Sequence, residues 1–178
     1  MIITLIGYRG CGKSSVGPLL AERRNCPCID SDHEIEARAR KSIREIFADD
    51  GEPEFRRMES EVLEELLSGP PAVIAAGGGA ILSDVNRKRM KDAGPVVWLN
   101  ASPETLASRI GQDAASQERR PSLTGRSIED EVRDVLTARL PLYRDAATMM
   151  VDADSATPAQ IAEQILQQLD HLNSGVTS

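Results

Sequence analysis

Residues 2–15 read IITLIGYRGCGKSS, and the types and spacing of four of them suit phosphate binding. Gly7, Gly12, Lys13 and Ser14 fill every fixed position of the pattern G-x-x-x-x-G-K-[ST], known as the P-loop. Glycines let backbone N–H groups turn toward an anion, and the helix that follows begins with unpaired donors and a partial positive charge. We therefore expect Lys13 to reach the β- and γ-phosphates of ATP and the Ser14 hydroxyl to ligate the bridging Mg²⁺.

The context of this motif is that of a strand, a loop and a helix, because an apolar run precedes it and VGPLLAERR follows it. The alternative is a glycine-rich turn that only connects a strand to a helix. The residues expected to line the nucleotide site from this loop are Gly7, Arg9, Gly10, Cys11, Gly12, Lys13, Ser14 and Ser15.

Two carboxylates follow the next strand-like segment. Asp30 and Asp32 come directly after CPCI, and Ser31 or Asp32 is the predicted N-cap of a helix formed by HEIEARA. Asp32 is the candidate general base, because a carboxylate beside an acceptor hydroxyl orients it and accepts its proton, which is typically worth about 10²–10⁴-fold in rate. Asp30 is the candidate to hold Mg²⁺ through water. The alternative is that both aspartates only cap the helix.

Two arginines are candidates for binding a substrate carboxylate. Arg56 follows Phe55 at the start of a predicted helix, and Arg139 lies in a later one. A guanidinium at either position can clamp a carboxylate with two hydrogen bonds, whereas the alternative is a solvated arginine on a helix surface. Glu59, one helical turn after Arg56, is placed to orient it, although an exposed ion pair at this spacing is equally natural.

Residues 111–126 contain few apolar side chains and many polar and turn-forming ones. A connection of this length is often a functional lid that closes over a substrate. Arg119 and Arg120 lie within it, and an arginine delivered on closure would stabilise charge on a transferred phosphoryl group. The alternative is that both are solvated loop charges.

The elements that must position these residues alternate between short apolar runs and helical patterns. The runs predict strands near residues 2–6, 27–32, 72–76, 96–100 and 148–153. The periodicity predicts helices near residues 13–24, 33–39, 41–48, 54–67, 83–93, 102–110, 127–145 with an interruption at Pro141, and 157–171. This alternation is typical of an α/β fold with a parallel sheet covered on both faces.

Three of the chemical features follow three consecutive predicted strands. The P-loop follows the first strand, the aspartates follow the second, and Gly77-Gly78-Gly79 follow the third. In a doubly wound sheet, ligands bind beyond the carboxyl ends of the strands. We therefore expect a phosphate-binding loop, a carboxylate pair and a bare stretch of backbone to surround one crevice.

The composition argues against a nucleic-acid or membrane partner. The 178 residues carry a net charge of -7 and only 3% aromatics, which disfavours both attraction to polynucleotides and base stacking. No signal-type or transmembrane-length apolar run occurs, and the three cysteines offer no second pair to complete a zinc site with Cys26 and Cys28. We expect a cytoplasmic protein with a single domain at 1–172 and a disordered tail at 173–178.

From Ile2 to about Leu169 the sequence closely resembles the shikimate kinases. The resemblance rests on the motifs GYRGCGKSSVG, DSDHEIE, SIREIFADDGEPEFRRMES, the GGG after AVIAA, RRPSL and RLPLYRDAA. The P-loop is shared with many kinases, but D-x-D followed by I-x-x-I-F…G-E-x-x-F-R is much more specific. The resemblance implies the three-layer P-loop fold of nucleoside monophosphate kinases, with a five-stranded parallel sheet in the order 2-3-1-4-5, a shikimate-binding region at about 31–60 and a mobile lid.

The resemblance also implies an activity and roles for individual residues. The activity is ATP- and Mg²⁺-dependent phosphorylation of the shikimate 3-hydroxyl, in aromatic amino acid biosynthesis, by a monomer. Asp32 resembles the base, Arg120 the lid arginine that meets the phosphate, and Arg109 and Pro158 the adenine-side contacts. The residues expected to bind shikimate are Asp32, Phe47, Phe55, Arg56, Glu59, Gly77, Gly78, Gly79 and Arg139. The lid segment QDAASQERRPSLTG is locally its own, so its contacts are the least defined.

Three other functions compete with this interpretation. A kinase of another small acceptor, such as gluconate, would share the fold, but the D-x-D and F-R motifs argue against it. A nucleoside monophosphate kinase would instead phosphorylate AMP or CMP. A non-catalytic, nucleotide-dependent interaction protein is disfavoured because the catalytic motifs are complete.

Overall fold

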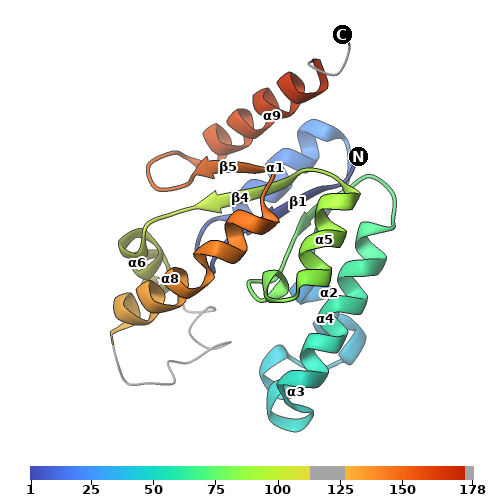
Figure 1. Ribbon diagram of the computed structural model, residues 1–178, viewed down its shortest axis with the longest axis vertical. Coiled ribbons are helices and arrows are strands. Elements are labelled where there is room, and N and C mark those ends of the chain that lie inside the picture. The colour runs from blue at the N-terminus through green and yellow to red at the C-terminus, as the bar shows by residue number, and fades with distance from the viewer. Residues whose placement is uncertain (113–126, 175–178) are drawn as a thin grey trace.

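A computed structural model describes residues 1–112 and 127–174 of the chain. It confirms the α/β fold with a five-stranded, wholly parallel sheet in the order β2-β3-β1-β4-β5 (Figure 1). The strands are β1 (Ile3–Ile6), β2 (Cys28–Asp30), β3 (Val73–Ala75), β4 (Val96–Asn100) and β5 (Met149–Asp152).

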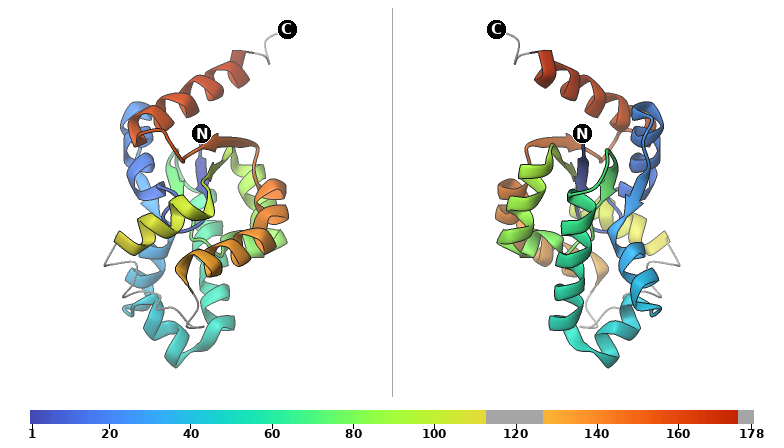
Figure 2. Two further views of the ribbon diagram at one scale, coloured as in Figure 1. Left: turned by 90° about the vertical axis from the view of Figure 1, so that its left-hand side faces the viewer. Right: turned by 90° about the vertical axis from the view of Figure 1, so that its right-hand side faces the viewer.

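Helices connect the strands and cover both faces of the sheet. They are α1 (Lys13–Arg24), α2 (Ser31–Ala39), α3 (Ile43–Asp49), α4 (Gly51–Leu67), α5 (Asp84–Ala93), α6 (Pro103–Gln112), α8 (Ile128–Ala146) and α9 (Pro158–Ser174), with a short 3₁₀ turn η1 (Ala80–Leu82). Figure 2 shows α1 on one side of the strands and α5 and α8 on the other. Within the described ranges, no helix is long and apolar enough to cross a membrane.

The central strands β1, β3 and β4 bury successive side chains, which point to opposite sides of the sheet, whereas the edge strand β5 exposes Met150 and Asp152. Leu5 and Leu99 pack among side chains of α1 and α9 on one face. Ile6 and Trp98 pack with α4, α5 and α8 on the other, where the Trp98 ring stacks on Tyr143 with 5.4 Å between centroids. This two-sided burial fixes the sheet whose carboxyl edge carries the site.

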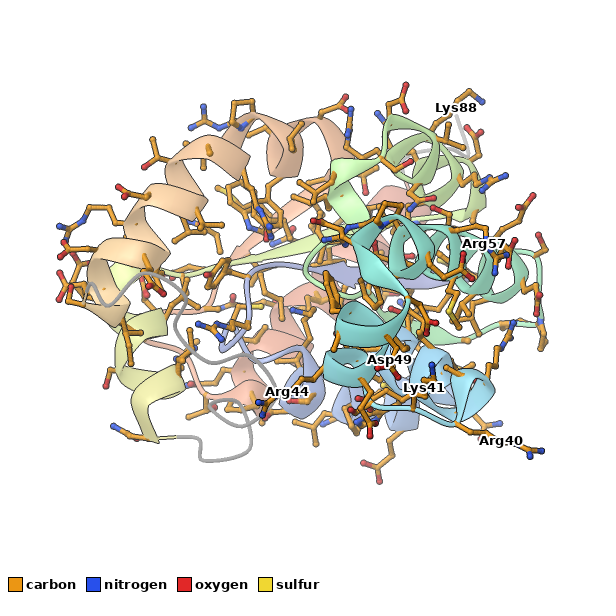
Figure 3. The ribbon with its side chains drawn as sticks, turned by 90° about the horizontal axis from the view of Figure 1, so that it is seen from below. Arg40, Lys41, Arg44, Asp49, Arg57 and Lys88 are labelled. Carbon is orange, nitrogen blue, oxygen red and sulfur yellow. The ribbon has the colours of Figure 1, made fainter. Side chains whose placement is uncertain are left out.

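Helices α2, α3 and α4 form a separate small core beyond the sheet, at the bottom of Figure 1. Its buried members are Ile35, Ile43, Ile46, Phe55 and Val62. Helix α3 begins with a reciprocal capping box, in which the Glu45 N–H donates to Ser42 Oγ and the Ser42 N–H donates to the Glu45 carboxylate. Figure 3 shows Lys41 beside Asp49, and the Lys41 ammonium also lies 2.9 Å from Asp50. These helices include the segment of about 31–60 for which shikimate binding stays a prediction.

The structure corrects the predicted start of the second helix. Neither Ser31 nor Asp32 is the N-cap; Asp30 is, since its Oδ1 accepts the N–H groups of Asp32 at 2.9 Å and His33 at 3.3 Å. A capping carboxylate satisfies donors that would otherwise lack a partner in the first turn. Asp32 therefore lies in the first turn of α2, where the helix holds its direction.

Four other predicted boundaries also move. Helix α4 starts at Gly51 rather than near residue 54, because Gly51 adopts the left-handed φ of 82° that lets the chain turn directly from α3. Helix α8 continues through Pro141 without the predicted interruption. Gly111 and Gln112 belong to α6 instead of the predicted lid, and α9 continues to Ser174, so residues 173 and 174 are helical rather than part of the predicted tail.

Candidate functional site

The P-loop connects β1 to α1 through three glycines with positive φ. The φ angles of Gly7, Gly10 and Gly12 are 149°, 81° and 103°, a region that other residues rarely adopt. A side chain at Gly7 would also collide with the Leu99 carbonyl oxygen. These positions therefore require glycine to bring the backbone of the loop close to an anion.

Lys13 begins α1 and folds back over the loop. Its ammonium donates to the Gly7 carbonyl at 2.7 Å and lies 3.4 Å from the Tyr8 carbonyl, with the buried Cys11 sulfur 3.7 Å away. The helix cap, Gly12, has no side chain to occupy the first N–H groups. The positive charge and the helix donors thus face the same loop, which is the arrangement an anionic phosphate needs.

Arg109 lies on α6 and links this loop to the residues that follow β5; its nucleotide role stays a prediction. Its guanidinium donates to the Ala153 carbonyl at 2.8 Å and contacts the Gly10 carbonyl at 3.4 Å. Asp154 ties the start of α6 to the same place by accepting the Ser102 N–H at 2.8 Å. Burial opposes ionisation of Asp154, but hydrogen bonds from Ser102 and Thr105 lower its pKa. Pro158 is exposed at the start of α9.

The three-glycine segment after β3 is the surface on which the acceptor-side residues gather. A side chain at Gly77 would overlap Asp32 Oδ1 and come within 3.3 Å of Glu59 Oε1. A side chain at Gly79 would overlap the Arg56 guanidinium. The predicted convergence of the aspartate segment and the glycines is confirmed. Residues 77 and 79 need to be glycine because the side chains of Asp32 and Arg56 occupy the space that a Cβ atom at these positions would take.

Arg56 is held by two glutamates rather than by solvent. It donates to Glu59 Oε2 at 2.7 Å and to Glu52 Oε1 at 3.1 Å, and its guanidinium lies 5.1 Å from the Phe55 ring centroid. Burial alone would lower the pKa of Arg56, but the Glu59 and Glu52 carboxylates raise it. The Glu59 side chain is only 3% exposed, so the alternative of an ordinary surface ion pair is wrong.

Arg139 reaches the same glycine segment from α8. Its guanidinium donates to the Gly78 carbonyl at 2.9 Å. Tyr143, one turn later, is fully buried against Trp98 and anchors this part of the helix. Burial raises the pKa of the Tyr143 hydroxyl, so it stays neutral at any physiological pH. Two guanidiniums from different helices therefore border one strip of backbone.

Aromatic side chains close the site on the α3 side. The rings of Phe47 and Phe55 lie 4.7 Å apart between centroids. Phe55 is fully buried, whereas Phe47 is 36% exposed. An exposed ring beside a buried one is suited to covering part of a small ligand.

The side-chain oxygens of Ser14 and Asp30 are suited to bind a magnesium ion that arrives with a nucleotide. The described part of the chain has no cluster of three or more His, Cys, Asp or Glu side chains that would hold a metal by itself. Ser14 exposes its hydroxyl at the start of α1, and Asp30 presents a carboxylate whose Oδ1 caps α2. Mg²⁺ usually keeps several waters and takes one or two protein oxygens beside substrate phosphates, so these residues fit it.

Two predicted site residues lie outside the described residues, and two residues of the site were not predicted from the sequence. Arg119 and Arg120 belong to the undescribed residues 113–126, and their roles stay predictions. Ser31 was missed as a site residue, although its hydroxyl accepts the Gly77 N–H at 2.9 Å. Glu52 was missed as a partner of Arg56, although the four-residue spacing on one helix was a visible signal.

Several known proteins are similar to this chain in sequence and in fold over most of its length. A family model described as shikimate kinase matches residues 9–170. A shikimate kinase of Rhodopirellula baltica is 44% identical over 163 residues, which cover 92% of this chain and 87% of that protein. A shikimate kinase of Symbiobacterium thermophilum is 41% identical over 170 residues, covering 95% of this chain and 96% of that protein. A solved shikimate kinase from Acinetobacter baumannii in complex with shikimate is 37% identical, with a TM-score of 0.89 over 99% of this chain and 95% of that chain.

Proposed function

The chain belongs to the shikimate kinase family, and we propose that it transfers the γ-phosphoryl group of ATP to the 3-hydroxyl of shikimate, giving shikimate 3-phosphate and ADP. The observation that carries this proposal is the gathering of Asp32, Arg56 and Arg139 around residues 77–79. A carboxylate and two guanidiniums complement an acceptor that has both a hydroxyl to activate and a carboxylate to bind.

On the acceptor side, Arg56 and Arg139 bind the shikimate carboxylate and so fix the ring. Glu59 holds Nη1 of Arg56, and the exposed Glu52 carboxylate, which accepts from Nε and Nη2, gives up this edge of the guanidinium to the substrate carboxylate. Asp32, which lies against Gly77, then orients the hydroxyl and takes its proton. Fixing both ends of a small ring supplies the positioning on which phosphoryl transfer mainly depends.

On the nucleotide side, Lys13 and the first turn of α1 bind the phosphates. Lys13 exchanges the Gly7 carbonyl for the β- and γ-phosphate oxygens when ATP enters the loop. Ser14 would hold Mg²⁺ directly and Asp30 would hold it through water; when bound, the ion would neutralise phosphate charge. Arg120 is proposed to add positive charge as the lid closes.

The proposal is tested by ADP release from MgATP with shikimate, gluconate or AMP as the acceptor. We expect a saturable rate with shikimate alone, and a phosphorus–proton coupling at carbon 3 of the isolated product. A comparable rate with gluconate or AMP would support a rival kinase. ATP binding without any acceptor-dependent release would support a non-catalytic protein. We also propose that the enzyme is a cytoplasmic monomer, and light scattering of the purified protein tests the monomer.

A methyl group at Gly79 should weaken shikimate binding without unfolding the protein. In Gly79→Ala the new methyl displaces the Arg56 guanidinium, the movable end of a flexible side chain, so the cost in stability is small. We expect the KM for shikimate to rise roughly 10-fold through loss of a charged hydrogen bond, with the KM for ATP unchanged. Initial-rate kinetics measure both constants.

A double-mutant cycle identifies the cause of that change. If Gly79→Ala acts through Arg56, it should have little further effect in an Arg56→Ala background. An effect of the same size in both backgrounds would show that the methyl group acts on shikimate by another route.

Arg109 should matter for ATP and not for shikimate. Arg109→Ala removes the donor that connects Gly10 to Ala153, and we expect the KM for ATP to rise roughly 10-fold while the KM for shikimate stays constant. Arg133→Ala is the matched control, because Arg133 is 49% exposed and its ion pairs with Glu104 and Glu129 lie at the surface. An unchanged KM for ATP in Arg109→Ala would remove Arg109 from the nucleotide site.

A further inference from the structure

Ser31 lies between the two aspartates and is almost completely buried, with 1% of its surface exposed. Its hydroxyl oxygen accepts the N–H of Gly77 at 2.9 Å, across 46 residues of sequence. The β2–β3 ladder ends where Asp30 lies opposite Ala75, and the Ala76 N–H turns the other way to the Leu5 carbonyl. The Ser31 hydroxyl therefore links the segment that follows β2 to the segment that follows β3, just beyond the last paired residues of the two strands.

The Gly77 backbone in turn determines where the acceptor-side charges lie. It is in contact with Asp32, because a side chain there would overlap that carboxylate. The next two residues meet the two arginines: the Gly78 carbonyl accepts from Arg139, and Gly79 lies under Arg56. A shift of Gly77 would change the distance from Asp32 to both guanidiniums together.

We propose that Ser31 is a positioning residue for phosphoryl transfer. Ser31 does not touch the substrate; its hydroxyl fixes the position of residues 77–79 relative to Asp32. When the two arginines hold the carboxylate of shikimate, the 3-hydroxyl of the substrate then lies next to the Asp32 carboxylate. This inference rests on the proposed function and deepens it. It predicts that loss of the hydroxyl damages turnover of shikimate far more than binding of ATP, because the hydroxyl bonds the acceptor-side glycine segment.

The test compares Ser31→Ala, Ser31→Thr and Ser31→Val in the shikimate-dependent ADP-release assay. Thr keeps the hydroxyl and Val has the same shape without it, so the pair separates hydrogen bonding from packing. We expect kcat to fall about 10- to 100-fold in Ser31→Ala and Ser31→Val, as for a misplacement of reacting groups by about 1 Å, and Thr to restore most of it. The dissociation constant of MgATP, measured by calorimetry, should be unchanged in all three.

A purely structural role predicts a different pattern. Thermal unfolding of each variant gives the folded fraction at the assay temperature, and kcat is expressed per folded molecule. Wild-type kcat in folded Ser31→Ala would overturn the proposal, as would equal losses in folded Thr and Val variants; if the larger side chains do not fold, Ser31→Ala alone decides. Ser68→Ala is the matched control, since its hydroxyl bonds the Glu64 carbonyl at 2.8 Å at the exposed end of α4. If wild type itself shows no shikimate-dependent release, it is the proposed function that fails.

Discussion

Asp32→Asn should lower kcat for shikimate phosphorylation by roughly 10²–10⁴-fold, the usual worth of a general base. The amide keeps the size of the carboxylate but cannot accept the proton of the attacking hydroxyl. Asp32 is fixed in the first turn of α2 against Gly77, so we expect no other carboxylate to take over its role as the base. The affinity for MgATP should stay the same, since the P-loop lies on other elements. Initial rates of ADP release at saturating substrate measure kcat, and calorimetry measures the dissociation constant of MgATP.

A second carboxylate of the same region serves as the control. Asp49→Asn removes an exposed carboxylate from the α3 side, where Lys41 keeps Asp50 as a partner. Its kcat should match that of the wild type. If Asp32→Asn turns over shikimate as fast as Asp49→Asn does, Asp32 is not the base and the assignment of the acceptor site is wrong.

Arg56→Lys should lower kcat/KM for shikimate by roughly 10- to 150-fold, which corresponds to about 1.5–3 kcal/mol for a charged hydrogen bond. Lysine keeps the charge but loses the planar fork, which can bond a carboxylate through Nε and Nη2 while Glu59 holds Nη1. Most of the loss should appear in the KM for shikimate, because the clamp acts on the bound substrate before and during transfer. The KM for ATP should not change.

The neighbouring arginine gives a matched control for this substitution. Arg57, labelled in Figure 3, is 54% exposed and pairs with Glu54 and Glu61 on the outer face of α4. Arg57→Lys should leave all kinetic constants within about twofold, as expected for an exposed ion pair. Equal effects of the two substitutions would mean that α4 responds to charge or stability in general and that Arg56 is no clamp.

The sheet and the P-loop could be predicted from the sequence because their signals are local. Short apolar runs that alternate with helical patterns predict a parallel sheet, and Gly7, Gly12 and Lys13 stand at fixed spacing in a strand–loop–helix context. Helix boundaries depend on cap chemistry and were less accurate. Asp30 caps α2 in place of the predicted residues, and Pro141 lies inside α8.

Contacts between distant segments could not be predicted in the same way. That the Ser31 hydroxyl meets the Gly77 amide depends on the register of β2 against β3, which no local pattern specifies. The burial of Glu59 depends on how α4 packs against the glycine segment. The sequence offered Arg139 as a candidate carboxylate clamp and the family resemblance favoured it, but neither predicted its bond to the Gly78 carbonyl.

The central claim is that two arginines hold a substrate carboxylate so that Asp32 meets the hydroxyl. Its most direct test is the rate of ADP release with shikimate and with shikimate methyl ester, which keeps every hydroxyl but has no charge to bind. Losing the bonds from Arg56 and Arg139 to the substrate carboxylate should cost about 2–5 kcal/mol, so we predict that kcat/KM for the ester is at least roughly 30-fold lower. An ester that is phosphorylated as efficiently as shikimate would contradict the account.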